Sequence, residues 1–233
     1  MKSWLKLGLA TLLLAGCQSA HMPVPSDADA ERMKVYGRQG LKIDESIRFG
    51  SFQVTVSERS AVRGPDLVLS EVFERNRRRQ RFSFDIQHQD DVSWHSSCDV
   101  MLEKHTVRTK VVDIAADDRS RLKCTIAGVE PGVEEWLLVV STKDASPMQG
   151  KLTSGTISMP VNGTNQLQHG LPAEETTGYV ISLQDNRFVY VDVLDSGTVW
   201  MPVIEQDYRN AVGAAVAALL LYEDLRAHTA EAT

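Results

Sequence analysis

The sequence has few cysteines, no apolar run of membrane-spanning length and no signature of a known catalytic site. Its 233 residues include three cysteines. The apolar stretches 7–14 and 211–222 are shorter than the ~18 residues that a membrane-spanning helix needs. The chain contains no Gly-x-Ser-x-Gly, no His-Glu-x-x-His and no glycine-rich phosphate loop. These absences predict a protein that is not an enzyme and that binds no cofactor.

The charge balance narrows the class of partner. Lys and Arg total 25 and Asp and Glu total 31, which gives a formal net charge of −6. An acidic surface repels the phosphate backbone of DNA and RNA. We therefore expect no nucleic-acid partner.

The start of the chain resembles the signal peptide of bacterial lipoproteins. The apolar stretch 7–14 follows the cations Lys2 and Lys6. It ends in a sequence that resembles a lipobox, Leu14-Ala15-Gly16-Cys17. The resemblance implies cleavage before Cys17, acylation of Cys17 with chains such as palmitate, and a lipid anchor in the cell envelope. The absence of Asp after Cys17 favours the outer membrane in this family. A plain signal peptide is the alternative.

The rest of the chain is expected to form a tether and one domain. Residues 18–32 have two prolines, alternating Asp and Ala and no periodic apolar face, which is typical of a flexible segment. Fully extended, they would reach ~50 Å. We expect a signal peptide at 1–16, a lipidated N-terminus and tether at 17–32, and a single β-rich domain at 33–233.

Cys98 and Cys124 are expected to form a disulfide. They are an even pair in a chain that is expected to reach an oxidising compartment. Cys98 shares the strand parity of Val100, and Cys124 shares that of Leu122, so both should face the core. Two buried free thiols are the alternative. No metal site is expected, because no second close pair of ligands completes a tetrahedral set.

Short alternating segments broken by Gly, Pro, Asn and Asp predict a chain made mainly of antiparallel strands. The segment 67–79 fits a strand or a short helix. One helix is expected at 207–226, with Asp207 as its N-cap and an uncharged interior that indicates burial on all sides. The clearest strand segments are 49–56, 81–86, 96–102, 107–114, 121–127, 136–141, 156–161, 179–183, 188–194 and 198–201.

This element order resembles that of the tubby C-terminal domain and the phospholipid scramblases, in which a barrel surrounds a helix. The resemblance is architectural and brings no binding residues with it. It implies a mainly β fold, an antiparallel barrel of about 10–12 strands with one apolar C-terminal helix that could fill its interior. A β-sandwich with the helix packed over one face is the alternative.

A dense basic run is the main candidate binding feature. Arginine guanidinium groups suit phosphate and carboxylate groups, so the candidate ligands are anionic lipid, lipopolysaccharide and cell-wall polymer. A solvated hairpin loop is the alternative. The candidate anion-binding residues are Arg75, Arg77, Arg78, Arg79 and Arg81.

Two further patterns in the sequence are weak matches to catalytic or metal sites. Ser120 and Lys123 match the Ser-x-x-Lys spacing of some acylating enzymes, but in a strand they would point to opposite faces. His88, His95 and His105 lie on neighbouring segments with Asp90 and Asp91, and we expect exposed loop histidines rather than a metal site.

We therefore expect a lipid-anchored envelope protein with a binding or scaffolding role. A carrier or sensor of an apolar ligand is the alternative, and it requires an open cavity. A hydrolase that uses Ser120 or a histidine is a remote alternative.

Overall fold

The protein is mainly β, as shown by a computed structural model that describes residues 19–38, 46–68, 73–89, 93–108, 113–129, 132–143, 146–183 and 186–226. In chain order the strands are β1 Glu31–Tyr36, β2 Ser46–Phe49, β3 Phe52–Arg59, β4 Asp66–Val68, β5 Phe73–His88, β6 Trp94–Arg108, β7 Asp113–Gly128, β8 Trp136–Lys143, β9 Gln149–Ser154, β10 Ile157–Thr164, β11 Gly178–Ser182, β12 Phe188–Asp192 and β13 Thr198–Met201. The helix α1 spans Gln206–Leu221.

Twelve of these strands form a closed antiparallel barrel. The hydrogen-bonded order is β3-β2-β1-β13-β12-β11-β10-β9-β8-β7-β6-β5, and β3 pairs with β5 to close the ring. β4 pairs only with the far part of β5 and lies outside the ring. Alternate residues of each strand are buried, as in β3, where Phe52, Val54 and Val56 face inward. Closure confirms the predicted barrel and excludes the sandwich.

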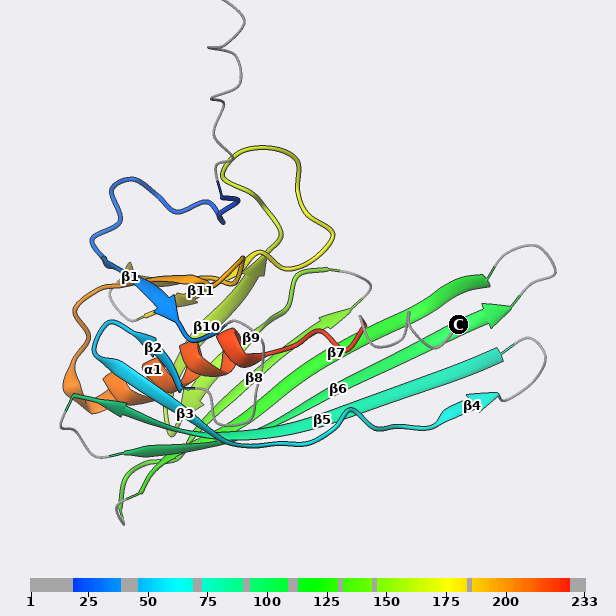
Figure 1. Cartoon of the computed structure of the whole chain (residues 1–233), viewed down its shortest axis with the longest axis horizontal. Helices are drawn as coiled ribbons and strands as arrows, with labels where there is room; N and C mark the ends of the chain where they lie inside the picture. Colours follow the sequence, from blue (N-terminus) through cyan, green and yellow to red (C-terminus); the bar gives the residue numbers. More distant parts are fainter. Residues whose placement is uncertain are drawn as a thin grey trace, which may run out of the picture.

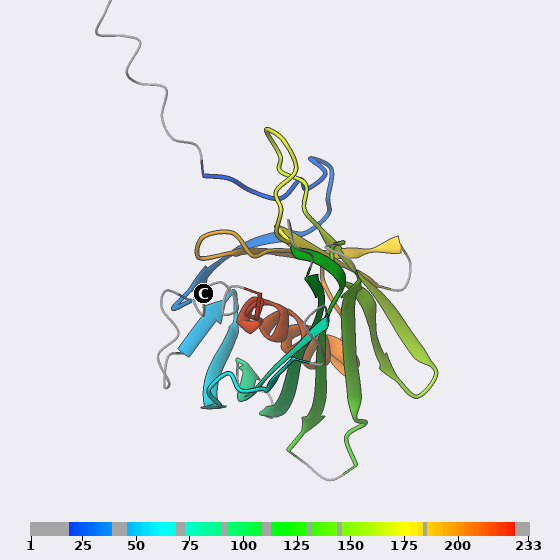
Figure 2. The same ribbon diagram turned by 90° about the vertical axis from the view of Figure 1, so that its right-hand side faces the viewer.

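α1 fills the interior of the barrel (Figures 1 and 2). It packs against β5, β6 and β7 on one side and β12 on the other, and its residues 211–221 are buried on every side. Gly213 lets the helix approach the wall, since a Cβ there would lie 2.4 Å from the Phe52 ring. No helix among the described residues is long and apolar enough to span a membrane.

The helix ends differ from the prediction. Glu205 is the N-cap residue without a side-chain cap hydrogen bond, so Asp207 lies in the first turn rather than at the cap. The helix ends at Leu221, five residues before the predicted end. There the barrel wall supplies positive charge to the free carbonyl groups, because Arg38 donates to Leu220 O (2.8 Å) and Arg59 donates to Leu221 O (2.9 Å).

β5, β6 and β7 are about twice as long as their neighbour β8 and project beyond the barrel (Figure 1). Cys98 and Cys124 are direct partners in the β6–β7 register, with a Cα–Cα distance of 4.1 Å, and they form the predicted disulfide. Both are buried, as their parity predicted.

Two predicted strands differ from the structure. The segment 49–56 is split between β2 and β3 by a turn at Gly50, whose φ is +54°. Residues 107–108 end β6 and residues 113–114 begin β7, so 107–114 is not one strand. The described parts of 67–79 are strand, in β4 and β5. The prediction also missed β1 and β9.

The described part of the predicted tether, residues 19–32, is not free along its whole length, because it contacts the barrel at His21 and Met22. The His21 side chain lies 2.8 Å from the Asp192 carboxylate on β12, and Met22 is 1% exposed. Regular structure then begins at Glu31 with β1. Burial of Met22 and the polar contacts of His21 hold this segment on the outer wall. Cys17, the predicted signal peptide 1–16 and residues 227–233 lie outside the described residues.

Candidate functional site

Four of the five candidate arginines form a row on the outer face of β5. Arg75, Arg77, Arg79 and Arg81 occupy alternate positions and point outward, while Gln80 and the following even-numbered residues face the core. The Arg79 and Arg81 side chains are 51% and 67% exposed. The basic run is therefore an ordered strand, not the hairpin loop that was the alternative.

Two carboxylates of β6 hold this row in place. Glu103 accepts hydrogen bonds from Arg75 Nη2 (3.2 Å) and Arg77 Nε (2.9 Å). Asp99 accepts from Arg79 Nε (2.6 Å) and Arg81 Nε (3.3 Å). The hydrogen bond from Arg77 is the main cause that lowers the pKa of Glu103 below its usual value. Each carboxylate thus bridges two arginines.

A second basic row lies on β7. Arg119, Arg121 and Lys123 are exposed and stand opposite Glu103, Met101 and Asp99 in the register. We call the outward side chains of the two rows, together with Asp99 and Glu103, the cationic face. The face has two negatively charged carboxylates and seven positively charged side chains, those of Arg75, Arg77, Arg79, Arg81, Arg119, Arg121 and Lys123.

A groove opens beside the second row. It has a volume of about 770 Å³ and is lined by Arg119 and Arg121, by the carboxylate residue Glu103 and by the polar side chains of Ser141 and Gln149. Hydroxyl and amide groups next to two guanidinium groups are suited to oxygen-rich anions. This row was not predicted, because only the pairing of β6 with both β5 and β7 places it on the same face as the β5 arginines. The alternation of Arg119, Arg121 and Lys123 was the signal that could have found it.

Arg78 does not belong to the cationic face. Its parity on β5 places it on the opposite side of the strand from Arg77 and Arg79, and its guanidinium donates to Gly64 O (3.2 Å). Its predicted role in anion binding is therefore not supported by its position.

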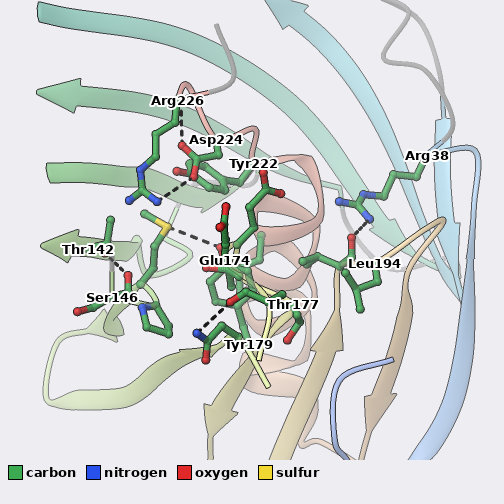
Figure 3. A pocket seen from close by; sticks show the side chains of 18 residues that line it. Arg38, Thr142, Ser146, Glu174, Thr177, Tyr179, Leu194, Tyr222, Asp224 and Arg226 are labelled. Atoms are coloured by element: carbon green, nitrogen blue, oxygen red, sulfur yellow. Dashed lines mark hydrogen bonds and ion pairs between the residues drawn. The ribbon is translucent and has the colours of Figure 1, made fainter. Parts of the chain in front are cut away.

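A second hollow, of about 470 Å³, lies at the end of the barrel where α1 stops (Figure 3). Arg38, Tyr179, Tyr222, Asp224 and Arg226 contribute to its lining. Several charged groups at this end already have partners, since Arg226 lies 3.2 Å from Asp118 and 3.5 Å from Asp224, and Arg38 donates to the C-terminal end of α1. The lining is mixed, because Met148, Val193 and Leu219 contribute apolar surface beside these charged groups.

No family model, curated protein or solved structure matches the chain.

The Ser-x-x-Lys pair is separated as predicted. Ser120 is buried on the inner face, where its Oγ lies 2.7 Å from the Tyr222 hydroxyl, and Lys123 is exposed on the outer face. Burial raises the pKa of Tyr222 above its usual value, so the phenol stays protonated and is a poor general base for Ser120.

The three histidines do not converge. His88 packs against the Phe52 ring at a centroid distance of 4.7 Å, and His95 contacts Asp85 at 2.8 Å on the outer face. His105 pairs in register with Arg75 near the far end of β5 and β6. Among the described residues, no three His, Cys, Asp or Glu side chains are grouped to hold a metal ion. Asp90 and Asp91 lie outside the described residues.

Proposed function

We propose that this protein is a lipid-anchored component of the bacterial cell envelope that binds an anionic partner through the cationic face and catalyses no reaction. The lipobox-like sequence around Cys17 supports the anchor. The observation that carries the binding role is the pair of outward basic rows, in which Glu103 and Asp99 fix the arginines.

The geometry of the two rows fits an extended polyanion. Alternate residues of a strand are ~7 Å apart, and β5 and β7, separated by β6, are ~10 Å apart. Arginine binds phosphate and carboxylate groups with two parallel hydrogen bonds. Concentration of these cations on one face of an acidic chain, with net charge −6, creates a local potential that attracts anions. Lipopolysaccharide, anionic lipid and cell-wall polymer all carry such groups.

The filled interior favours surface binding over transport of an apolar ligand. An apolar carrier needs an enclosed cavity of several hundred Å³. α1 occupies the barrel interior with buried side chains, among them Val212, Val216 and Leu219. The alternative of a carrier or sensor is therefore less well supported.

The binding role can be tested with two charge-matched double variants. R79Q/R121Q removes one guanidinium from each row, while K34Q/R48Q removes two exposed cations from β1 and β2. We expect R79Q/R121Q to weaken binding about tenfold, because two exposed ionic contacts contribute ~0.7 kcal/mol each, and K34Q/R48Q to have little effect.

The measurement is co-sedimentation of the mature protein with cell-wall sacculi, with lipopolysaccharide and with phosphatidylglycerol vesicles, at several salt concentrations. Binding should weaken as salt rises, since exposed charges are screened. Equal binding by the two double variants, or no binding of the wild type to any of the three probes, would contradict the proposal.

The anchor has its own test. Cys17→Ala should move the protein from the membrane fraction to the aqueous fraction, because two or three acyl chains bind a bilayer far more durably than any surface contact. Mass spectrometry of the wild-type mature chain should show an N-terminal Cys17 with acyl groups. An unmodified Cys17, or an unchanged distribution of the variant, would overturn the anchor.

A further inference from the structure

The N-terminal segment is fastened to one wall of the barrel. Asp192 is fully buried and its Oδ2 contacts His21 Nδ1 (2.8 Å) and accepts a hydrogen bond from Met22 N (3.3 Å). The backbone of Gln168 donates to His21 O (2.8 Å), and Met22 is buried beside Gly178. We call these contacts of His21 and Met22 with β11, β12 and the loop 165–177 the clamp.

The clamp shortens the distance between Cys17 and the domain. Cys17 precedes His21 by four residues, and four residues span at most ~14 Å. A free segment 18–32 would have reached ~50 Å. An acyl group on Cys17 therefore holds the clamped wall close to the bilayer.

The cationic face lies on the opposite wall. In the twelve-strand ring, β12 and β6 are separated by five strands in either direction. α1 packs between them, and in both views the N-terminal segment and the loop 165–177 lie on the β11–β12 side (Figures 1 and 2). Each wall packs ~10 Å from the axis of α1, so the two walls are ~20 Å apart. This exceeds the Debye length of ~8 Å at physiological salt.

We infer that the clamp orients the protein on its membrane, with β12 toward the anchoring bilayer and the cationic face away from it, so that the face binds anionic cell-wall polymer and not the lipid of its own membrane. The inference rests on the proposed lipid anchor and the proposed anion binding. The clamp selects the partner by geometry, since lipid headgroups and cell-wall polymer offer similar anionic groups to the same arginines.

The test uses the lipidated protein on two kinds of vesicle, of phosphatidylcholine alone and of phosphatidylcholine with phosphatidylglycerol, and measures capture of fragments of purified sacculi. The wild type is compared with His21→Ala, which loses the Asp192 contact. A second variant has about twelve Gly and Ser residues inserted between Ser19 and Ala20. The insert leaves the clamp intact and adds a root-mean-square reach of ~20 Å, which is enough to free the orientation.

We expect the wild type to capture sacculus fragments equally well on both kinds of vesicle. The insertion variant should capture them on phosphatidylcholine and lose at least half of this capture when phosphatidylglycerol is present, because its cationic face can reach the lipid. His21→Ala should show a partial loss of the same kind.

Four other results would overturn the inference or a proposal on which it rests. Phosphatidylglycerol could reduce capture by the wild type as strongly as by the insertion variant, which would show that the face reaches its own membrane. The insertion variant could remain insensitive to phosphatidylglycerol, which would show that the clamp does not set the orientation. Failure of every protein to capture sacculi on phosphatidylcholine would instead refute cell-wall binding, and an unacylated Cys17 would refute the anchor.

Discussion

At the scale of residues, the cationic face depends on shared carboxylates. Asp99 and Glu103 are both partly buried and each joins two arginines of β5. Without them, guanidinium groups ~7 Å apart on one strand would repel each other. The carboxylates thus stabilise the strand at a cost to the net positive charge of the face.

Glu103→Gln should change both the stability of the protein and its affinity for anions. Arg77 and Arg75 lower the pKa of Glu103, so its ionised form stabilises the fold at neutral pH, and this contribution is lost as the pH falls through the lowered value. We expect the variant to lose less than ~1 kcal/mol of unfolding free energy at pH 7. The difference from the wild type should shrink below pH ~4, near the usual pKa of Glu. Urea titrations across this pH range measure the difference.

The same variant should bind sacculi a few-fold more tightly, because one negative charge leaves the cationic face. Asp85→Asn is the matched control, since Asp85 lies outside that face and pairs with His95. A stability difference that persists unchanged at acid pH, or weaker binding by Glu103→Gln, would contradict this account.

At the scale of elements, α1 approaches β3 closely at Gly213. Gly213 faces the Phe52 ring, which is itself packed against Phe49 and His88 at centroid distances of 5.1 and 4.7 Å. The ring therefore has neighbours on more than one side. A methyl group at position 213 has little space to enter.

Gly213→Ala should therefore destabilise the protein. Helix propensity alone would favour alanine by ~1 kcal/mol, whereas overpacking a core costs ~1–3 kcal/mol. Because the added Cβ would lie 2.4 Å from the ring, we expect the overpacking cost to be at the upper end and the net loss to be ~2 kcal/mol. Urea unfolding measures it, and Phe52→Leu in the same chain should restore part of the loss. If Gly213→Ala were more stable than the wild type, the Phe52 side chain would have to move to accommodate the added methyl group.

At the scale of the whole molecule, local patterns in the sequence predicted the fold better than they predicted the site. Strand parity placed Cys98 and Cys124 in the core, and the uncharged stretch 211–222 indicated a helix buried on all sides. The two basic rows become one face only through the register of β5, β6 and β7. The contact between His21 and Asp192 joins residues 171 positions apart. No local pattern carries that information, so the segment around His21 was interpreted as a free tether.

The inner position of α1 has a consequence for how the chain folds. α1 follows all of the described strands in sequence, and β1 pairs with β13 across more than 160 residues. None of the strands can bury its inward side chains against the helix until that helix has been synthesised. The molecule therefore has a high contact order and is expected to fold slowly and late. This delay would suit the proposed export across a membrane, because the wall strands stay unassembled until α1 is present.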